Sequence, residues 1–400
     1  MILWWPGIAL GAVLSLYSIY WALSLTYGVL KVTFSRDSAD PIDPPDLPRI
    51  SVVIPARDEA EVVGRTVQAL DDVSYPRDKL EVIFVEDGST DGTLDILRSF
   101  ASTREWMRVY HVEGSGGKAA AINFALGISS GDLIYVLDAD SIPERDSLLR
   151  IAGIYSTGAK AMAGRYAVAN AGESVVSRMV ILEELVWRFM CEGRSWLHMP
   201  CPPPAGANYA VDRKLLLEIG GLKEGSLAED AALASALVGA GVRPVYSGVV
   251  AMVSAPTTLR GLFAQRIRWY RGYLEAMADS VRRLRSSRDR LGTFDLVLLF
   301  SSPVFAMLGL INIALNAWIA PWIELFLAGL AAATLALWAY MKYLGGYYGR
   351  ESGAAWLAIP YSIILSVISS AAVLMHAARA KRSWNKGRHS SYVDPGRIPG

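Results

Sequence analysis

Residues 132–140 read DLIYVLDAD, an apolar run that ends in two aspartates two positions apart. Two earlier stretches have the same form, ISVVIPARDE at 50–59 and LEVIFVED at 80–87. Short apolar runs rich in β-branched and aromatic residues predict buried strands, and here they alternate with helical patterns. The predicted strands are 50–55, 80–86, 107–112, 132–137 and 160–166. This alternation predicts an α/β fold built on a mostly parallel, doubly wound sheet.

Acidic residues follow three of the predicted strands. Glu59 lies just after the first strand, Asp87 after the second, and Asp138 with Asp140 after the fourth. In an open parallel sheet, ligands bind beyond the carboxyl ends of the strands. Any one of these acids is more simply explained as a cap of the helix that follows. Acids after three strands of one sheet edge favour a shared ligand instead.

Asp138 and Asp140 are predicted to bind a divalent cation. Carboxylates at positions i and i+2 can reach one hard ion when a strand breaks into a turn, and oxygen ligands suit Mg²⁺ or Mn²⁺. A diphosphate would complete the coordination, and the ion would neutralise the charge that builds on it. A surface turn is the alternative use of Asp-x-Asp, but the buried run before it favours the metal site.

The composition indicates contact with lipid. Of the 400 residues, 52% are apolar and only 19% are charged, which exceeds what one soluble core needs. Nearly uncharged runs at about 7–30, 295–341 and 354–378 are each long enough for one or two membrane spans. A net charge of +1 argues against nucleic acid as a partner, and two cysteines with four scattered histidines offer no zinc or disulfide framework.

The charges around the first run predict its orientation. We interpret this run as an anchor rather than a cleaved signal peptide, because no basic residue precedes it and no small-residue cleavage site closes it. Lys31 and Arg36 follow it, so the positive-inside rule places the next domain in the cytoplasm. Four spans in total would put the basic tail outside, against the same rule. Three crossings, with a last segment that re-enters or lies in the interface, are the alternative.

Gly114 to Lys118 reads GSGGK and resembles a phosphate-binding loop. The spacing is wrong, because Val112 stands where the first glycine belongs and Ala119 stands where a Ser or Thr would hold magnesium. The segment therefore argues against an ATPase, and the absence of a GxGxxG fingerprint argues against a nicotinamide cofactor. Lys118 remains a candidate contact for the phosphate or base of a nucleotide sugar.

Two further motifs follow. Glu229-Asp230 opens a helical pattern after a Gly-rich turn, where capping of the helix explains Glu229 well. Residues 265–269 read QRIRW and lie in a basic, aromatic helical segment, which is typical of a helix at a membrane surface. The arginines would also suit a diphosphate, and the indole would suit the C–H face of a sugar ring. Both uses are compatible.

The motifs, in this order and flanked by apolar spans, resemble those of family 2 inverting glycosyltransferases of the cellulose-synthase-like type. The resemblance covers roughly residues 50–275, and QxxRW is its most specific part. It implies a nucleotide-binding GT-A-type fold with Asp230 as general base. The implied donor-binding residues are Pro55, Arg57, Glu59, Asp87, Lys118, Asp138 and Asp140. The implied diphosphate and acceptor contacts are Glu229, Gly206, Asn208, Gln265, Arg268 and Trp269.

The sequence departs from that family pattern in three places. Ala228 replaces the threonine often found before Glu-Asp, only one span precedes the catalytic domain, and 342–353 contains no Phe-rich gating loop. A long polymer channel is therefore not expected. Segment 174–199 has an apolar helical stripe opposite Glu183 and Glu192, which predicts either an interface helix or packing on the sheet.

The predicted organisation is an anchor at 1–30, a linker at 31–48, a cytoplasmic glycosyltransferase domain at 49–256, amphipathic interface helices at 257–292, membrane helices at 293–378 and a basic tail at 379–400. The predicted protein is a multi-pass enzyme of the cell membrane. It would move a hexose, with GDP-mannose preferred over a UDP-hexose as donor, to a lipid-linked or polyprenyl-phosphate acceptor. Five arginines between 282 and 290 would attract its anionic head group.

Three alternatives remain at this level. A processive polysaccharide synthase shares the same motifs. A transporter or flippase is less favoured, because the spans hold almost no ionisable residue apart from Glu324 and His376. A non-catalytic binding subunit is less favoured because the acidic motifs are complete.

Overall fold

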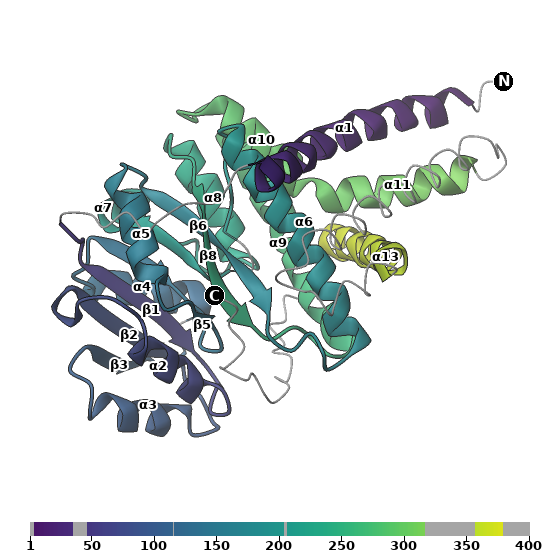
Figure 1. Cartoon of the computed structure of the whole chain (residues 1–400). Coiled ribbons are helices and arrows are strands. Elements are labelled where there is room, and N and C mark those ends of the chain that lie inside the picture. Colours follow the sequence, from purple (N-terminus) through teal and green to yellow (C-terminus); the bar gives the residue numbers. More distant parts are fainter. Residues whose placement is uncertain (1–3, 35–45, 115, 204–205, 317–356, 379–400) are drawn as a thin grey trace.

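The structure, a computed structural model, describes residues 4–34, 46–114, 116–203, 206–316 and 357–378. A single sheet lies beside a group of long helices (Figure 1). Its strands are β1 Ile50–Ala56, β2 Leu80–Glu86, β3 Met107–His111, β4 Leu133–Val136, β5 Ile142–Pro143, β6 Ala161–Val168, β7 Tyr209–Asp212 and β8 Val245–Val253. The helices are α1 Trp4–Phe34, α2 Val63–Asp71, α3 Thr93–Ala101, α4 Lys118–Ile128, α5 Ser147–Ser156, α6 Val175–Trp196, α7 Arg213–Glu218, α8 Glu229–Gly239, α9 Leu259–Arg283, α10 Arg290–Phe300, α11 Ser302–Asn316 and α13 Ala358–Ala377, with a short 3₁₀ turn at Arg77–Lys79.

The order of the strands is β3-β2-β1-β4-β7-β6-β8-β5. The five predicted strands are confirmed to within two residues. Parallel pairing holds across β3-β2-β1-β4 and between β6 and β8, but β7 runs antiparallel to both β4 and β6, and β5 runs antiparallel to β8. The sheet predicted to be mostly parallel is therefore mixed, and its antiparallel pairs all involve β7 or β5. The four-residue β7 is too short to carry a readable period.

Both faces of the sheet are buried, which explains why its strands read as continuous apolar runs. Val52 and Ile54 of β1 pack with α2, α3 and α5 in one core, whereas Val53 between them packs with α4, α7 and α8 in the other. This alternation follows from the two-residue period of a strand. The carboxyl ends of β1, β2 and β4 are thereby held rigidly at one edge.

Helix α6 lies between the sheet and α1 (Figure 1). Met179, Leu182 and Phe189 of its predicted apolar stripe are buried. Glu183 and Glu192, predicted to form a polar face, are instead engaged in ion pairs with Arg266 and Lys31. Segment 174–199 therefore packs on the sheet, as one of its two interpretations predicts, and it also packs against helices α1 and α13.

Helices α1 and α6 cross at two glycines. A methyl group on Gly28 would stand 1.8 Å from the carbonyl oxygen of Phe189, and one on Gly193 would stand 1.8 Å from that of Ser24. Small residues allow helix backbones to approach this closely, as is common between membrane helices. A buried network adds to the contact, because Tyr20 of α1 donates to Asp295 of α10 over 2.8 Å and Arg194 of α6 pairs with the same carboxylate.

A methyl group at the crossing is expected to destabilise the protein. Gly28→Ala should lower the free energy of unfolding by about 1–3 kcal/mol, the usual cost of overpacking. Gly11→Ala is the matched control on the same helix, because nothing lies within 4 Å of the methyl group it adds; it should be neutral or stabilise by up to about 1 kcal/mol. Thermal unfolding of the full chain in detergent compares the two. Equal melting temperatures would show that α1 does not dock on α6 in this way.

Two helices in the described part of the chain have the length and hydropathy of a membrane span, α1 over Ala9–Val32 and α13 over Ala358–Ala377. Helices α10 and α11 form a pair bent by 47°, which would make a third span if counted as one. In Figure 1, α1, α11 and α13 extend from the side of α6 and α9 that faces away from the sheet. The part of the predicted spanning run 295–341 that begins at residue 317, most of the linker 31–48 and the basic tail 379–400 lie outside the described residues.

Candidate active site

The turn after β1 and the end of β2 meet at the carboxyl edge of the sheet. The backbone N–H of Asp87 donates to the carbonyl of Ala56 over 2.9 Å, and the Arg57 guanidinium lies 3.9 Å from the Asp87 carboxylate. Glu59 is buried behind the turn, where its N–H donates to the Thr93 hydroxyl over 2.8 Å. Arg57 and Asp87 are thus brought together as expected, whereas Glu59 is buried and its backbone helps to hold the turn in place.

Asp138 lies beside a partly buried lysine. The Lys118 ammonium, at the first turn of α4, is 2.5 Å from Asp138 Oδ1 and 3.2 Å from Glu229 Oε1, and it donates to the carbonyl of Gly206 over 2.8 Å. Burial disfavours the ammonium, but the charges of Asp138 and Glu229 outweigh it and raise the pKa of Lys118. Lys118 is therefore a fixed positive charge where an anionic ligand would meet the aspartates.

Asp230 lies on the far side of the same cluster, in the first turn of α8. It is 5% exposed, and its Oδ2 accepts the Gly206 N–H over 2.7 Å. Burial, together with the neighbouring Glu229 charge, raises the pKa of Asp230 to about 6. Gly206 has a φ of +79°, and a methyl group on it would lie 2.9 Å from Glu229 Oε1. Only glycine therefore fits between these charged groups.

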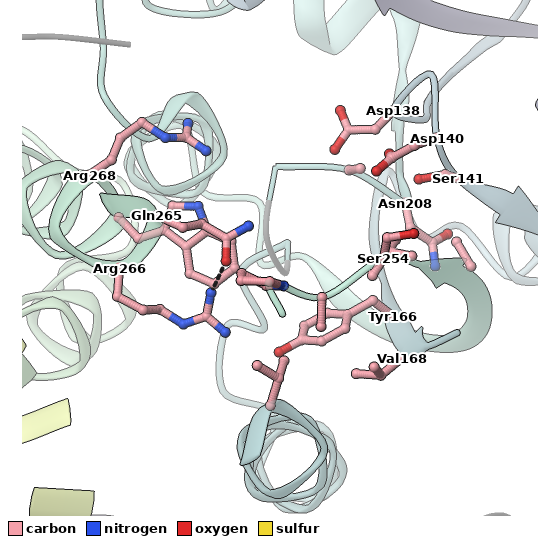
Figure 2. A pocket seen from close by; sticks show the side chains of 17 residues that line it. Asp138, Asp140, Ser141, Tyr166, Val168, Asn208, Ser254, Gln265, Arg266 and Arg268 are labelled. Carbon is pink, nitrogen blue, oxygen red and sulfur yellow. Dashed lines mark hydrogen bonds between the residues drawn. The ribbon is translucent and has the colours of Figure 1, made fainter. Parts of the chain in front are cut away.

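A pocket opens between the two aspartates and helix α9. Figure 2 shows Asp138, Asp140 and Ser141 on one side and Gln265, Arg266 and Arg268 on the other. Trp269 also lines this pocket, as do Tyr166, Val168 and Val253 from the sheet and Val180 from α6. The pocket thus joins the Asp-Ala-Asp turn to the QRIRW helix, which lie far apart in the sequence.

Asn208 is predicted to contact an acceptor, and it does line the pocket. Its amide is, however, engaged by the sheet. The Nδ2 group donates to the carbonyls of Arg165 and Val249 over 2.6 and 2.9 Å, and Oδ1 accepts from the Tyr135 hydroxyl over 2.7 Å. We therefore assign the side chain of Asn208 to holding the pocket wall.

Arg266 is the site residue that sequence reasoning missed. The sequence predicts that both arginines of this motif lie on a membrane-surface helix and suit a diphosphate, yet Arg266 is 1% exposed and pairs with Glu183. Glu183, beside the apolar stripe of α6, was the available signal, because a buried arginine requires a partner of opposite charge.

Asp138 and Asp140 could supply two of the ligands of a divalent ion. Within the described residues no group of three acidic, histidine or cysteine side chains converges on one point. Mg²⁺ and ions like it commonly take one or two carboxylates and complete their coordination with water and substrate phosphates. Two aspartates at the mouth of a pocket suit that mode of binding. Lys118 would compete with the ion for Asp138.

A family model described as Glycosyl transferase family 2 matches residues 51–215. This part of the chain is similar to family 2 glycosyltransferase domains. The match covers β1 to β7 and includes Asp87, Lys118, Asp138 and Asp140. Glu229-Asp230 and the QRIRW segment follow the matched region in sequence and line or adjoin the same site.

Proteins with related sequences are described as a probable glycosyltransferase and a glycolipid synthase. The Bacillus subtilis (strain 168) protein described as probable glycosyltransferase YdaM is 28% identical over 272 residues, or 66% of this chain and 65% of that protein. The beta-monoglucosyldiacylglycerol synthase of Synechocystis sp. is 29% identical over 241 residues, or 58% of this chain and 49% of that protein. The chain spans less than two thirds of either relative.

A solved structure shares the fold. Mannosyltransferase PcManGT from Pyrobaculum calidifontis, in complex with GDP-Man and Mn²⁺, superimposes with a TM-score of 0.65 at 23% sequence identity. The similarity covers 94% of this chain and 99% of that chain. The fold is therefore the GT-A-type α/β arrangement.

Proposed function

We propose that this protein transfers a hexose from a nucleotide-diphosphate sugar to an acceptor at the membrane, with inversion at the anomeric carbon. The observation that carries the proposal is the cluster of Asp138, Lys118, Glu229 and Asp230 around Gly206, next to the pocket that α9 lines. The cluster combines a fixed positive charge for a diphosphate with a buried carboxylate whose pKa suits a base near neutral pH.

Asp230 is the proposed general base. Its carboxylate would accept the proton of the acceptor hydroxyl as that oxygen forms a bond to the anomeric carbon and the diphosphate leaves from the opposite face. The proton ends on Asp230, and the negative charge ends on the diphosphate. The hydrogen bond from the Gly206 N–H fixes the orientation of the carboxylate.

Asp87, Lys118, Asp138 and Asp140 are the proposed donor contacts, together with the turn from Pro55 to Glu59. A divalent cation held by Asp138 and Asp140 would act as a Lewis acid on the leaving diphosphate. GDP-mannose is the preferred donor, and a UDP-hexose is the alternative. The shared fold of a mannosyltransferase solved with GDP-Man and Mn²⁺ supports the choice of both donor and ion.

A lipid-linked acceptor, such as a polyprenyl phosphate, is the proposed second substrate. Helices α1 and α13 have the length of membrane spans, and the relative from Synechocystis is a synthase of a glycosylated diacylglycerol. The five arginines at 282, 283, 285, 288 and 290 are exposed, so they are available to an anionic head group at the membrane surface. We accordingly propose a multi-pass protein of the cell membrane with its catalytic domain in the cytoplasm.

The expected products are one or a few sugars on a lipid. Purified full-length protein, labelled GDP-mannose or UDP-glucose and Mn²⁺ are incubated with either a membrane lipid extract or soluble oligosaccharides, and the products are sized. Label should appear in short, organic-extractable products only when lipid is present. A long polysaccharide made without lipid would instead identify a processive synthase, and it would overturn the proposed acceptor.

A further inference from the structure

A partly buried ion pair adjoins the pocket. Arg266 of α9 donates to Glu183 of α6 through Nε and Nη2, over 2.9 and 2.7 Å. The Tyr361 hydroxyl of α13 donates to the same carboxylate oxygen over 2.7 Å. Three helices distant in the sequence are joined at one carboxylate, and the third of them, α13, has the length and hydropathy of a membrane span.

The opposite side of Arg266 contacts the motif residues that line the pocket. Nη1 donates to Gln265 Oε1, the contact drawn as a dashed line in Figure 2. The guanidinium also stacks over the Trp269 ring, 4.1 Å from its centroid, a distance at which a cation is attracted to the face of an indole. One side chain therefore orients both the amide of Gln265 and the ring of Trp269.

Helix α13 supports this arrangement by packing as well as by its hydroxyl. Tyr361 and Ile368 are buried in the same apolar cluster as Leu262 of α9 and Val180 of α6. Val180 itself lines the pocket. The position of α13 against α6 and α9 thus determines the shape of a wall that an acceptor would touch. Lys118 and Asp138 lie on other elements, α4 and the turn after β4.

We propose that Arg266 is a positioning residue for Gln265 and Trp269, and that the membrane helix α13 holds it in place through the Tyr361–Glu183 hydrogen bond. Use of the acceptor then depends on how α13 is seated more strongly than binding of the donor does, because most of the proposed donor contacts lie on α4 and in the turns after β1, β2 and β4. This inference rests on the proposed function for the identity of the pocket's ligand. Its structural part, the dependence of α9 on α13, can be measured separately.

The test uses conservative variants of the full-length protein. Tyr361→Phe removes one hydroxyl, Glu183→Gln removes the charge that faces Arg266, and Arg266→Lys keeps the charge but loses the forked donors. Two controls are matched to them. Tyr17→Phe removes a hydroxyl of α1 that bonds to the Leu298 carbonyl, and Glu192→Gln neutralises a paired acid on the same helix α6. Neither control residue lines the pocket.

Transfer from labelled GDP-mannose with Mn²⁺ to membrane lipid extract is the first readout. Tyr361→Phe should raise the acceptor KM about threefold to tenfold, and Glu183→Gln about tenfold or more, the range of a lost hydrogen bond to a charged group. The donor KM and both controls should remain within about twofold of wild type. Combining Tyr361→Phe with Arg266→Lys should cost less than the product of the two single effects, because both variants act on one network.

Hydrogen exchange is the second readout and needs no activity. Peptides that span residues 259–273 of α9 should exchange faster in Tyr361→Phe than in wild type and Tyr17→Phe. Unchanged exchange in Tyr361→Phe would overturn the inference, whether or not the protein transfers mannose. Equal rises in donor and acceptor KM would also overturn it. A wild-type protein that transfers no sugar from either donor would instead count against the proposed function.

Discussion

Replacing Asp230 with asparagine is expected to abolish most of the transfer activity. Loss of a positioned general base typically costs a factor of about 10² to 10⁴ in turnover. Asparagine preserves the shape of the side chain, and its carbonyl oxygen can still accept the Gly206 N–H, so the loop and the donor contacts should remain in place. The measurement is kcat with saturating donor and acceptor, alongside donor affinity from ligand-induced thermal shift.

Glu81→Gln is the matched control for that variant. Glu81 is also a buried carboxylate, but it lies at the opposite end of β2, where it accepts hydrogen bonds from Ser51 and Ser130. Its substitution should leave turnover within about twofold, because it lies far from the charged cluster. Near-normal turnover in Asp230→Asn would remove Asp230 from the mechanism. A loss of donor affinity as large as the loss of kcat would indicate a structural role.

The pH profile gives an independent measure of the same group. Asp230 accepts a proton only when it is ionised, and its pKa is raised to about 6 by burial and by Glu229. The rate of transfer should therefore reach its plateau above that pH and should decline as the pH falls through it. One unit below, kcat/KM should be about tenfold lower, because that ratio reports the protonation of the free enzyme. In Asp230→Asn, the residual activity should lose this acidic limb.

Removal of divalent cations is expected to stop transfer completely. Without the ion, the carboxylates of Asp138 and Asp140 would face the donor's diphosphate directly, and like charges repel. Treatment with EDTA should bring product formation to background, and added Mn²⁺ or Mg²⁺ should restore it. Isothermal titration with GDP-mannose, with and without Mn²⁺, measures whether donor binding itself requires the ion.

Variants of Asp138 and Asp140 show whether the ion acts at these two aspartates or elsewhere on the protein. Asp138→Asn and Asp140→Asn should each raise the Mn²⁺ concentration needed for half-maximal transfer by about tenfold or more, since each removes a charged ligand. Asp95→Asn, an exposed aspartate of α3, should leave that concentration unchanged. Full activity in the presence of chelator would show that the two carboxylates do not hold a catalytic ion.

The sequence predicted the half of the fold in which each strand carries its own signal. Strands that are buried on both faces consist of continuous apolar runs, as in ISVVIPARDE and LIYVLDAD. Such runs can be recognised from residue type alone. The acids that follow them share one sheet edge because parallel strands end at the same edge. Asp87, Asp138 and Asp140 were predicted on this ground.

The strands β5, β7 and β8 were not predicted, and two of them, β5 and β7, have only two and four residues. β7 has four residues and lies between β4 and β6 only after the chain has passed through the long helix α6. Its position depends on long-range pairing, and no local pattern specifies such a pairing. Long-range hydrogen bonds to Arg165 and Val249 also hold the amide of Asn208, a predicted acceptor contact, in the wall of the pocket.

By itself, therefore, the sequence determined the class of fold, the acids at one edge of the sheet and the presence of long apolar helices, because residue type and spacing fix periodicity and charge. Only the tertiary structure decided which charges meet. It placed Lys118 between Asp138 and Glu229, Gly206 against Asp230, and Arg266 against a glutamate 83 residues away. A buried charge is stable only beside its partner, and the identity of that partner depends on how the helices pack in three dimensions.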